Sequence, residues 1–294
     1  MIKRNSFILF LWLFLLPASC TRFENELPEK REETIRIGTY NLQNLFDEFD
    51  DPDHEDGEKP PEQRLRALAD VITRINCDVL AVQEVENIEV LKSFNHLYLA
   101  DMYPHLVLVE GNDKRGIDVA VLSKIPIVKV ASYRDFIIPC SSLDAPVRFS
   151  RDLLAVSWYS PQGSLWTLLV THLKSGRTLE DRHLRSCQIK ALADICKDEG
   201  YVDPWGKGLV ILAGDLNAAP DDPDIKPLRM VPFSDPARDL PRRSTHRSGL
   251  TLDYILLSPE ADARYIVGSV KVFREFPAGI ASDHFPLFLD LKFY

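Results

Sequence analysis

The chain has 294 residues, of which 45% are hydrophobic and 27% are charged. This composition is typical of a soluble globular protein and excludes a disordered chain, a coiled coil and a collagen-like rod. The formal net charge of -9 argues against tight, nonspecific binding to nucleic acid, but not against turnover of a phosphate ester at a local cationic site.

The first nineteen residues have the pattern of a signal peptide. Lys3 and Arg4 precede an uninterrupted apolar stretch over 7–16, which is too short to span a bilayer of roughly 30 Å. Small residues directly before Cys20 are typical of a bacterial lipoprotein processing site, so Cys20 is expected to be the acylated N-terminus; a plain secretory signal is the alternative. Both predict export, and removal of 1–19 leaves 33 basic against 44 acidic residues, a net charge of -11.

Residues 20–34 are polar and lack an apolar period, which predicts a tether between the lipid and one folded domain at 35–294. An exported protein can form disulfides. Cys187 and Cys196 lie nine residues apart on one predicted helix and are unsuited to pair with each other. The chain has no CxxC motif and no Cys/His zinc spacing.

The first predicted element of the domain is a strand over 35–40, which runs into the polar segment 41–47. Pro60 and Pro61 then open a helix whose apolar residues recur with the helical period up to Ile75. An apolar strand over 78–83 leads directly into Glu84. Further strands are predicted at 106–110, 117–122, 127–133, 208–213, 252–257, 266–273 and 287–291.

Two strands, Leu153–Tyr159 and Leu165–Thr171, flank the turn sequence 160–163 and predict a hairpin. A helix is predicted over 180–196. The many strands with few helices predict two packed sheets with helices outside, in a protein that we expect to be a monomer.

Polar side chains fall where the predicted strands end. They are Asn41, Glu84, His172, Asp215 and Asn217, and the pair Asp283 and His284 precedes the final strand. Each alone is readily explained as a turn former or a structural histidine. Together, at one edge of a sandwich, they would bring carboxylate, amide and imidazole groups into one cleft.

Asp253 places one carboxylate in an otherwise apolar strand. A buried carboxylate needs a partner. Because a histidine that donates to a carboxylate has its tautomer fixed, Asp253 and His284 are a candidate acid-base dyad.

Six short motifs occur in order along the chain: Tyr-Asn-Leu-Gln-Asn-Leu-Phe-Asp, Val-Gln-Glu-Val-Glu, Thr-His-Leu-Lys-Ser, Gly-Asp-Leu-Asn, Leu-Asp-Tyr-Ile-Leu and Ser-Asp-His-Phe-Pro-Leu. Together they resemble the endonuclease/exonuclease/phosphatase superfamily, with the deoxyribonuclease I-like fold, over essentially all of 35–294. The resemblance implies an α/β fold, a four-layer α-β-β-α sandwich with two packed mixed β-sheets flanked by helices, and a metal-dependent hydrolase acting on phosphoester bonds.

The resemblance also implies roles for the motif residues. Glu84 would be the main metal ligand, with Asn41 beside it and Asp283 nearby, and this oxygen-rich set suits Mg2+, with Mn2+ as a substitute. Asp215 and Asn217 would orient the attacking water. His284, held by Asp253, would act as general base or phosphate anchor, and His172 would stabilise charge on the phosphoryl oxygens. The sequence leaves open whether Asp215 or His284 takes the proton.

Other matches are weaker. Arg151 resembles a phosphate-contacting arginine, although Asp152 and Leu153 stand where the family has a proline. Arg182, Arg185 and Gln188 are expected to serve packing or solvation, and Arg242, Arg243, His246 and Arg247 to lie in a solvated loop. The segment 47–58 holds eight acidic residues, which do not match a calcium-binding EF-hand loop; a solvated insert is favoured over a Ca2+ site.

Three functions remain in view. The first is a Mg2+-dependent phosphodiesterase anchored in the cell envelope, most simply an endonuclease that cleaves nucleic acid. The second has the same chemistry on a phospholipid headgroup or an inositol phosphate, which suits an acidic, lipid-tethered enzyme. The third is a non-catalytic binding protein on the same fold.

Overall fold

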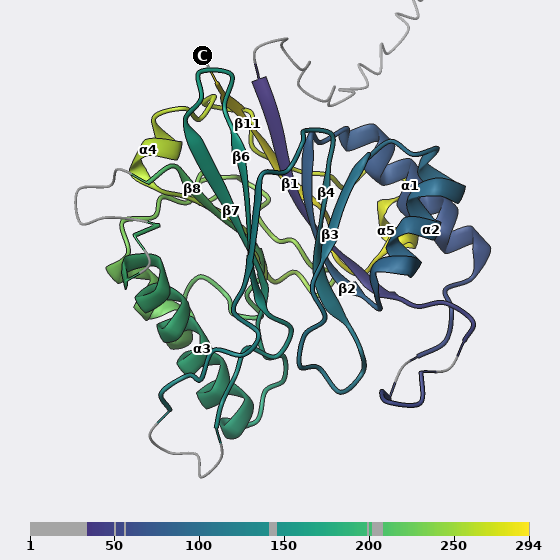
Figure 1. Ribbon diagram of the computed structural model, residues 1–294, viewed down its shortest axis with the longest axis horizontal. Helices are drawn as coiled ribbons and strands as arrows, with labels where there is room; N and C mark the ends of the chain where they lie inside the picture. The colour runs from purple at the N-terminus through teal and green to yellow at the C-terminus, as the bar shows by residue number, and fades with distance from the viewer. Residues whose placement is uncertain are drawn as a thin grey trace, which may run out of the picture.

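The computed structural model describes residues 34–49, 51–55, 57–140, 146–198, 200–201 and 208–293, which form two β-sheets packed face to face and covered by helices (Figure 1). The expected signal peptide at 1–19, Cys20 and the tether up to residue 33 lie outside the described residues. The first strand begins at Thr34, one residue before the predicted start of the domain.

The six-stranded sheet has the strand order β10-β11-β1-β2-β4-β3. Strands β1 and β2 run parallel, and the other neighbours in this sheet are antiparallel. Its strands are β1 (Thr34–Leu45), β2 (Val79–Val85), β3 (His105–Leu108), β4 (Asp118–Ser123), β10 (Lys271–Val272) and β11 (Leu287–Lys292).

The five-stranded sheet has the order β5-β6-β7-β8-β9, in which only β7 and β8 run parallel. The predicted hairpin at residues 153–171 is confirmed: Trp158 of β6 lies opposite Trp166 of β7, and the two rings stack at 4.4 Å. The strands are β5 (Lys129–Ser132), β6 (Leu153–Tyr159), β7 (Leu165–His172), β8 (Val210–Asp215) and β9 (Asp253–Leu257).

Three apolar layers hold the sheets and helices together. Alternate residues of both sheets, among them Ile37, Val121 and Leu168, fill the layer between the sheets. On the outer face of the six-stranded sheet pack α1 (Glu62–Ile75) and α2 (Ile88–Leu99), and on that of the five-stranded sheet packs α3 (Leu179–Asp198). The four-layer α-β-β-α sandwich is therefore confirmed (Figure 1).

Shorter helical segments complete the described chain: η1 (Pro223–Met230), α4 (Pro259–Asp262) and α5 (Ala278–Ala281). The helix predicted after Pro61 is α1, which buries Leu65, Leu68 and Ile72 against the sheet. None of the helices in the described ranges is long and apolar enough to cross a membrane.

Two features differ from the sequence-based expectation. The strand expected over 266–273 was wrong for most of its length: Gly268 turns with a φ of +84°, and only Lys271–Val272 pairs with β11. Helix α2 was not predicted, although Asn87 caps it by accepting hydrogen bonds from the amides of Glu89 and Val90.

The four cysteines in the described ranges comprise one disulfide-bonded pair and two free thiols. A disulfide joins Cys140 to Cys187 on α3, while Cys77 and Cys196 are buried free thiols. The expectation that Cys187 and Cys196 do not pair with each other is confirmed.

Candidate active site

The topology brings six strand-end residues to one end of the sandwich. His172, Asp215 and Asp253 are neighbours across β7, β8 and β9, because His172 pairs with Asp215 and Asp215 with Asp253. In the other sheet, β1 ends beside β2, and on its other side the antiparallel β11 begins. Asn41, Glu84 and His284 therefore face the same cleft from the six-stranded sheet.

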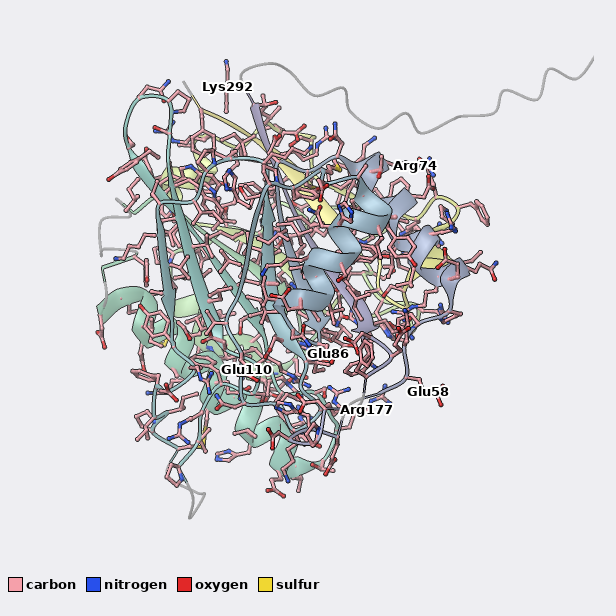
Figure 2. All side chains as sticks on the ribbon, turned by 45° about the vertical axis from the view of Figure 1, so that its right-hand side comes forward. Glu58, Arg74, Glu86, Glu110, Arg177 and Lys292 are labelled. Atoms are coloured by element: carbon pink, nitrogen blue, oxygen red, sulfur yellow. A yellow bond between two sulfur atoms is a disulfide. The ribbon has the colours of Figure 1, made fainter. Side chains whose placement is uncertain are left out.

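Two of the residues labelled in Figure 2, Glu86 and Glu110, show where this end of the molecule lies. Glu86 directly follows β2, and Glu110 follows β3 by two residues; both lie in the lower half of the view. Lys292, the last residue of β11, lies at the opposite end (Figure 2).

Glu84 and Asn41 leave the regular ladder of the six-stranded sheet. The pairing register shifts at both positions, and Glu84 has a φ of +63°. A bulge of this kind turns a side chain out of the alternating pattern, and a non-glycine residue with positive φ is held there by its surroundings. The Glu84 carboxylate accepts hydrogen bonds from the Asn44 amide (3.0 Å) and the Asn41 side-chain amide (3.2 Å).

Asp215 lies at the centre of the site. Its Oδ2 atom accepts a hydrogen bond from Asn41 Nδ2 at 3.1 Å and lies 3.6 Å from His172 Nε2 and 3.7 Å from His284 Nε2. Its Oδ1 atom accepts from the amide of Asn217 at 2.8 Å. One carboxylate oxygen thus meets nitrogens from both sheets.

The close approach of β8 to β7 explains the glycine before Asp215. Gly214 has a φ of +141°, and a Cβ atom there would lie 1.9 Å from the carbonyl oxygen of Thr171. Only glycine fits this backbone, which sets the direction of the Asp215 side chain.

His284 and Asp253 form the contact expected from the sequence. His284 Nδ1 lies 2.8 Å from Asp253 Oδ2, and both side chains are buried. Burial by itself lowers the pKa of His284, but the charge and hydrogen bond of Asp253, together with the charge of Asp215, raise it to about 10. His284 is therefore an imidazolium at neutral pH in the metal-free protein, and it is ill suited to accept a proton.

Asp215 has the opposite property. Burial raises its pKa to about 7, and the negative charge of Asp253 adds to the effect, while His284 acts against it. A carboxylate that titrates near neutral pH is suited to general-base chemistry.

His172 differs from His284 although both face Asp215. Burial and then the positive charges of Arg151 and His284 hold the pKa of His172 well below its usual value of 6.5. Its Nδ1 atom has no hydrogen-bond partner among the residues that the structure describes. His172 therefore offers a neutral ring rather than a positive charge.

The oxygen donors of the site fit a hard divalent cation. Each carboxylate oxygen of Glu84 accepts one hydrogen bond among the described residues, and His172 Nε2 lies 3.9 Å from Oε1. The nearby Asn44 has a buried Oδ1 atom without a hydrogen-bond partner in the described part of the chain. Asp283 lies one residue before His284, and its carboxylate is 3.5 Å from His246 Nε2. Ligand atoms of His246, Asp283 and His284 lie within 4.8 Å of one another, as do those of Asp215, Asp253 and His284.

Arg151 is placed differently from the other residues of interest. Its side chain is 2% exposed, its Nε pairs with Asp113 at 2.8 Å, and one of its terminal nitrogens donates to the carbonyl of Leu173. These contacts order the loop before β4 and the end of β7. Its role in contacting substrate stays a prediction.

The weaker sequence matches have structural contacts. Gln188 is fully buried and joins Lys174 to Arg148 and Ser150. Arg185 donates to the carbonyl groups of Lys174 and Gly176 and pairs with Asp224. Of the loop arginines, Arg243 pairs with Asp235, and Arg247 donates to the carbonyls of Gly279 and Ser282 rather than to Asp253.

Several positioning residues were missed by the sequence analysis. Arg64 of α1 donates to the carbonyls of Leu42, Gln43 and Ala281, so one guanidinium joins the end of β1, next to Asn41, to the segment before Asp283. In the sequence, Arg64 is visible only as an arginine beside the apolar stripe of a predicted helix. Arginines that are merely solvated occur at such positions as well, so the pattern does not identify a positioning residue.

A second missed group anchors the loops before β9 and β11. Ser282 donates to the carbonyl of Asn41 and accepts from the amide of His284. Thr245 accepts from the amide of Asp253. Gln43 accepts from the amide of Asp283. These contacts join segments far apart in the sequence.

Comparison with known proteins agrees with this geometry. The profile described as the Endonuclease/Exonuclease/phosphatase family matches residues 38–284. A comparison with curated proteins found no match.

Solved structures with the same fold include an endonuclease/exonuclease/phosphatase from Beutenbergia cavernae (TM-score 0.61, 19% identity, covering 89% of this chain and 72% of that one). The human Nocturnin catalytic domain with bound sulfate has a TM-score of 0.61 and 21% identity, covering 89% and 95% of the two chains. An AP endonuclease from Archaeoglobus fulgidus has a TM-score of 0.59 and 18% identity, covering 88% and 99%. At these identities the likeness concerns the fold alone.

Proposed function

Because the chain belongs to the endonuclease/exonuclease/phosphatase family, whose members are metal-dependent phosphoester hydrolases, we propose that it is a Mg2+-dependent phosphodiesterase that cleaves nucleic acid outside the cytoplasm. The observation that carries the proposal is the surroundings of Asp215 Oδ2, which meets Asn41, His172 and His284 at 3.1–3.7 Å. A carboxylate tuned to neutral pH beside an imidazolium is suited to activate water against a phosphodiester.

Glu84, Asn41 and Asp283 would hold the metal ion. Bound there, a divalent cation would neutralise charge on the phosphoryl oxygens. Carboxylate and amide oxygens favour Mg2+ or Mn2+ over softer metals. The contact of Glu84 with the Asn44 amide and of Asp283 with Gln43 fixes the loops that carry these ligands.

Three side chains of the site have separate roles in the proposed reaction. Asp215, kept in place by Asn41 and by the Asn217 amide, accepts the proton of the attacking water. His284, charged because of Asp253, anchors a phosphate oxygen. His172, as a neutral ring, supplies an N–H to charge that develops on the phosphoryl group.

A compact phosphate ester is the second candidate substrate. The formal net charge is -9, and -11 without residues 1–19, so the protein surface outside the site repels the rest of a long polyanion. A phospholipid headgroup or an inositol phosphate is compact and meets less of this repulsion.

A substrate panel tests the proposed function. Plasmid DNA, RNA, sphingomyelin and inositol phosphates are incubated with the purified protein and Mg2+ or with EDTA. We expect metal-dependent nicking of plasmid DNA. Cleavage of a lipid or inositol phosphate without nicking would select the second candidate, and an inert protein would remove the enzymatic proposal.

We also propose that the protein is a monomer anchored in the cell envelope through a lipid on Cys20, a reading that rests on the sequence pattern of residues 3–20. Cys20→Ser is expected to release the protein from membranes and leave its specific activity unchanged. Fractionation of cells measures this. A variant that fractionates like the wild type would contradict the lipid anchor.

A further inference from the structure

A pocket of about 400 Å3 adjoins the candidate active site. It shares two residues with the site. Asn217, on the wall of the pocket, donates its amide to Asp215, and His246, also on the wall, meets the ring of His284 edge to face at 4.7 Å between centroids. Its volume lies within the about 300–1,000 Å3 that is typical of small-ligand sites.

Three arginines line this pocket, which we call the arginine pocket: Arg177, Arg182 and Arg185. One acidic residue, Asp222, is also in the lining, and Arg182 pairs with it at 3.2 Å. The arginine pocket is thus a positively charged region of a protein whose net charge is negative.

The three arginines differ in what they already bind. Arg185 is 3% exposed and is held by Asp224 and two backbone carbonyls. Arg182 is held by Asp222. Arg177 is exposed and has no acidic partner within 4.0 Å among the described residues, so its guanidinium is free to bind an anion. Figure 2 labels it at the same end of the molecule as Glu86.

Another part of the lining is apolar. Leu250 and Leu252 lie before β9, and 40% of the Leu250 surface is exposed. A guanidinium suited to phosphate and an apolar surface suited to a sugar or base occur in the same pocket. A nucleotide presents both kinds of surface, whereas an inositol phosphate has hydroxyl groups around its ring.

We propose that the arginine pocket binds the nucleotide next to the scissile phosphate, with the phosphate of that nucleotide on Arg177 and its sugar or base against Leu250 and Leu252. This inference rests on the proposed phosphodiesterase function and names the substrate class of the same site. It predicts that a second phosphate on a short substrate increases both binding and turnover.

Three probes measure the effect in the full chain with Mg2+. They are the thymidine dinucleotide, the same dinucleotide with a phosphate at its 5′ or 3′ end, and bis(p-nitrophenyl) phosphate, which has no second phosphate. We expect one of the phosphorylated dinucleotides to be preferred. Arg177→Gln should lower kcat/KM for that substrate about tenfold, which corresponds to about 1.4 kcal/mol, because the phosphate loses a charged hydrogen-bond donor. Turnover of bis(p-nitrophenyl) phosphate should change less than about twofold.

Arg66→Gln is the matched control. Arg66 lies on α1, its side chain is 73% exposed, and it pairs with Glu62 of the same helix. This variant removes the same charge from the molecule outside the pocket, and it should leave turnover of all probes unchanged.

Binding separates this inference from the proposed function. Calorimetry with hydrolysis-resistant phosphorothioate dinucleotides measures the affinity of the arginine pocket for its ligand, even if the protein cleaves nothing. Tighter binding of a terminally phosphorylated analogue, lost in Arg177→Gln, supports the pocket whether or not any diester is cleaved. Three outcomes would overturn it. All dinucleotides could bind equally, Arg177→Gln could lower the turnover of every probe to the same extent, or the protein could prefer inositol bisphosphate to the dinucleotides.

Discussion

The two sheets meet at the site with different chemistry. The edge of the six-stranded sheet presents Glu84 and Asp283, whose carboxylates are partly accessible and are held by backbone amides or neighbouring side chains. The edge of the five-stranded sheet presents Asp215 and Asp253, which are both 1% exposed. The comparison shows how carboxylates at one site are suited to different tasks: the accessible pair can hold a cation, and the buried pair raises the pKa of His284.

The two histidines show the same contrast. His284 has a carboxylate at 2.8 Å and is charged, whereas the closest carboxylate oxygen to His172 is at 3.6 Å and the ring is neutral. Each of the following changes alters one side of this comparison.

The largest effect is expected at the six-stranded edge. Glu84→Gln keeps the shape of the side chain but removes the charge that a metal ligand supplies, so kcat/KM should fall at least ~100-fold. Thermal stability without metal should change little. Steady-state kinetics and melting curves measure both, and turnover near that of the wild type would remove Glu84 from the metal site.

The next largest effect is expected from loss of the contact between Asp253 and His284, which joins the two sheets. His284→Ala should reduce kcat/KM by roughly 50-fold, and Asp253→Asn should cause most of that loss. The double variant should be little worse than His284→Ala, because residues that act as a unit are non-additive.

A double-mutant cycle on kcat/KM, with the melting temperature measured beside it, checks this coupling. Losses that multiply independently would mean that Asp253 is a structural carboxylate and that His284 acts without it.

The dependence of kcat/KM on pH tests which edge supplies the base. If Asp215 accepts the proton, the rate should rise with pH up to about pH 7, where the Asp215 carboxyl group loses its proton, and it should fall by about tenfold per unit below that pH. It should decline at high pH as His284 loses its charge near pH 10. If His284 were the base, the rate would instead keep rising towards pH 10.

A smaller effect is expected from the positioning contact of Arg64, which joins two segments at the end of the six-stranded sheet. Arg64→Met removes the guanidinium that joins Leu42, Gln43 and Ala281 but retains most of the apolar stem. We expect kcat/KM to fall roughly fivefold, since small misplacements of reacting groups are costly. Arg64→Lys should restore little because one ammonium cannot reach all three carbonyls. A wild-type rate in Arg64→Met would show that the loops hold their positions without it.

The residues of the site could be predicted from the sequence because they are polar residues that directly follow short apolar strands. Asp253 could be paired with His284 because a buried carboxylate needs a partner. The fold class followed from the number of strands and the motifs in order.

The rest depends on contacts between distant segments. Arg64 is 217 residues from Ala281, and nothing in its local sequence distinguishes it from a solvated arginine. The positive φ of Glu84 comes from a bulge that local propensity does not indicate. The pKa of His172 is lowered by burial and by the charges of Arg151 and His284, whereas that of His284 is raised by Asp253 and Asp215. Only the folded chain brings these groups together.

The central claim is that His172 is neutral and His284 is charged within one site. Ring 15N chemical shifts of the metal-free protein, recorded against pH, test it directly; His172→Gln and His284→Gln assign the two signals among the seven histidines. We expect the His284 ring to keep both protons well above pH 8, and the His172 ring to stay neutral well below its ordinary pKa of 6.5. Two rings that titrate together near pH 6.5 would contradict the account.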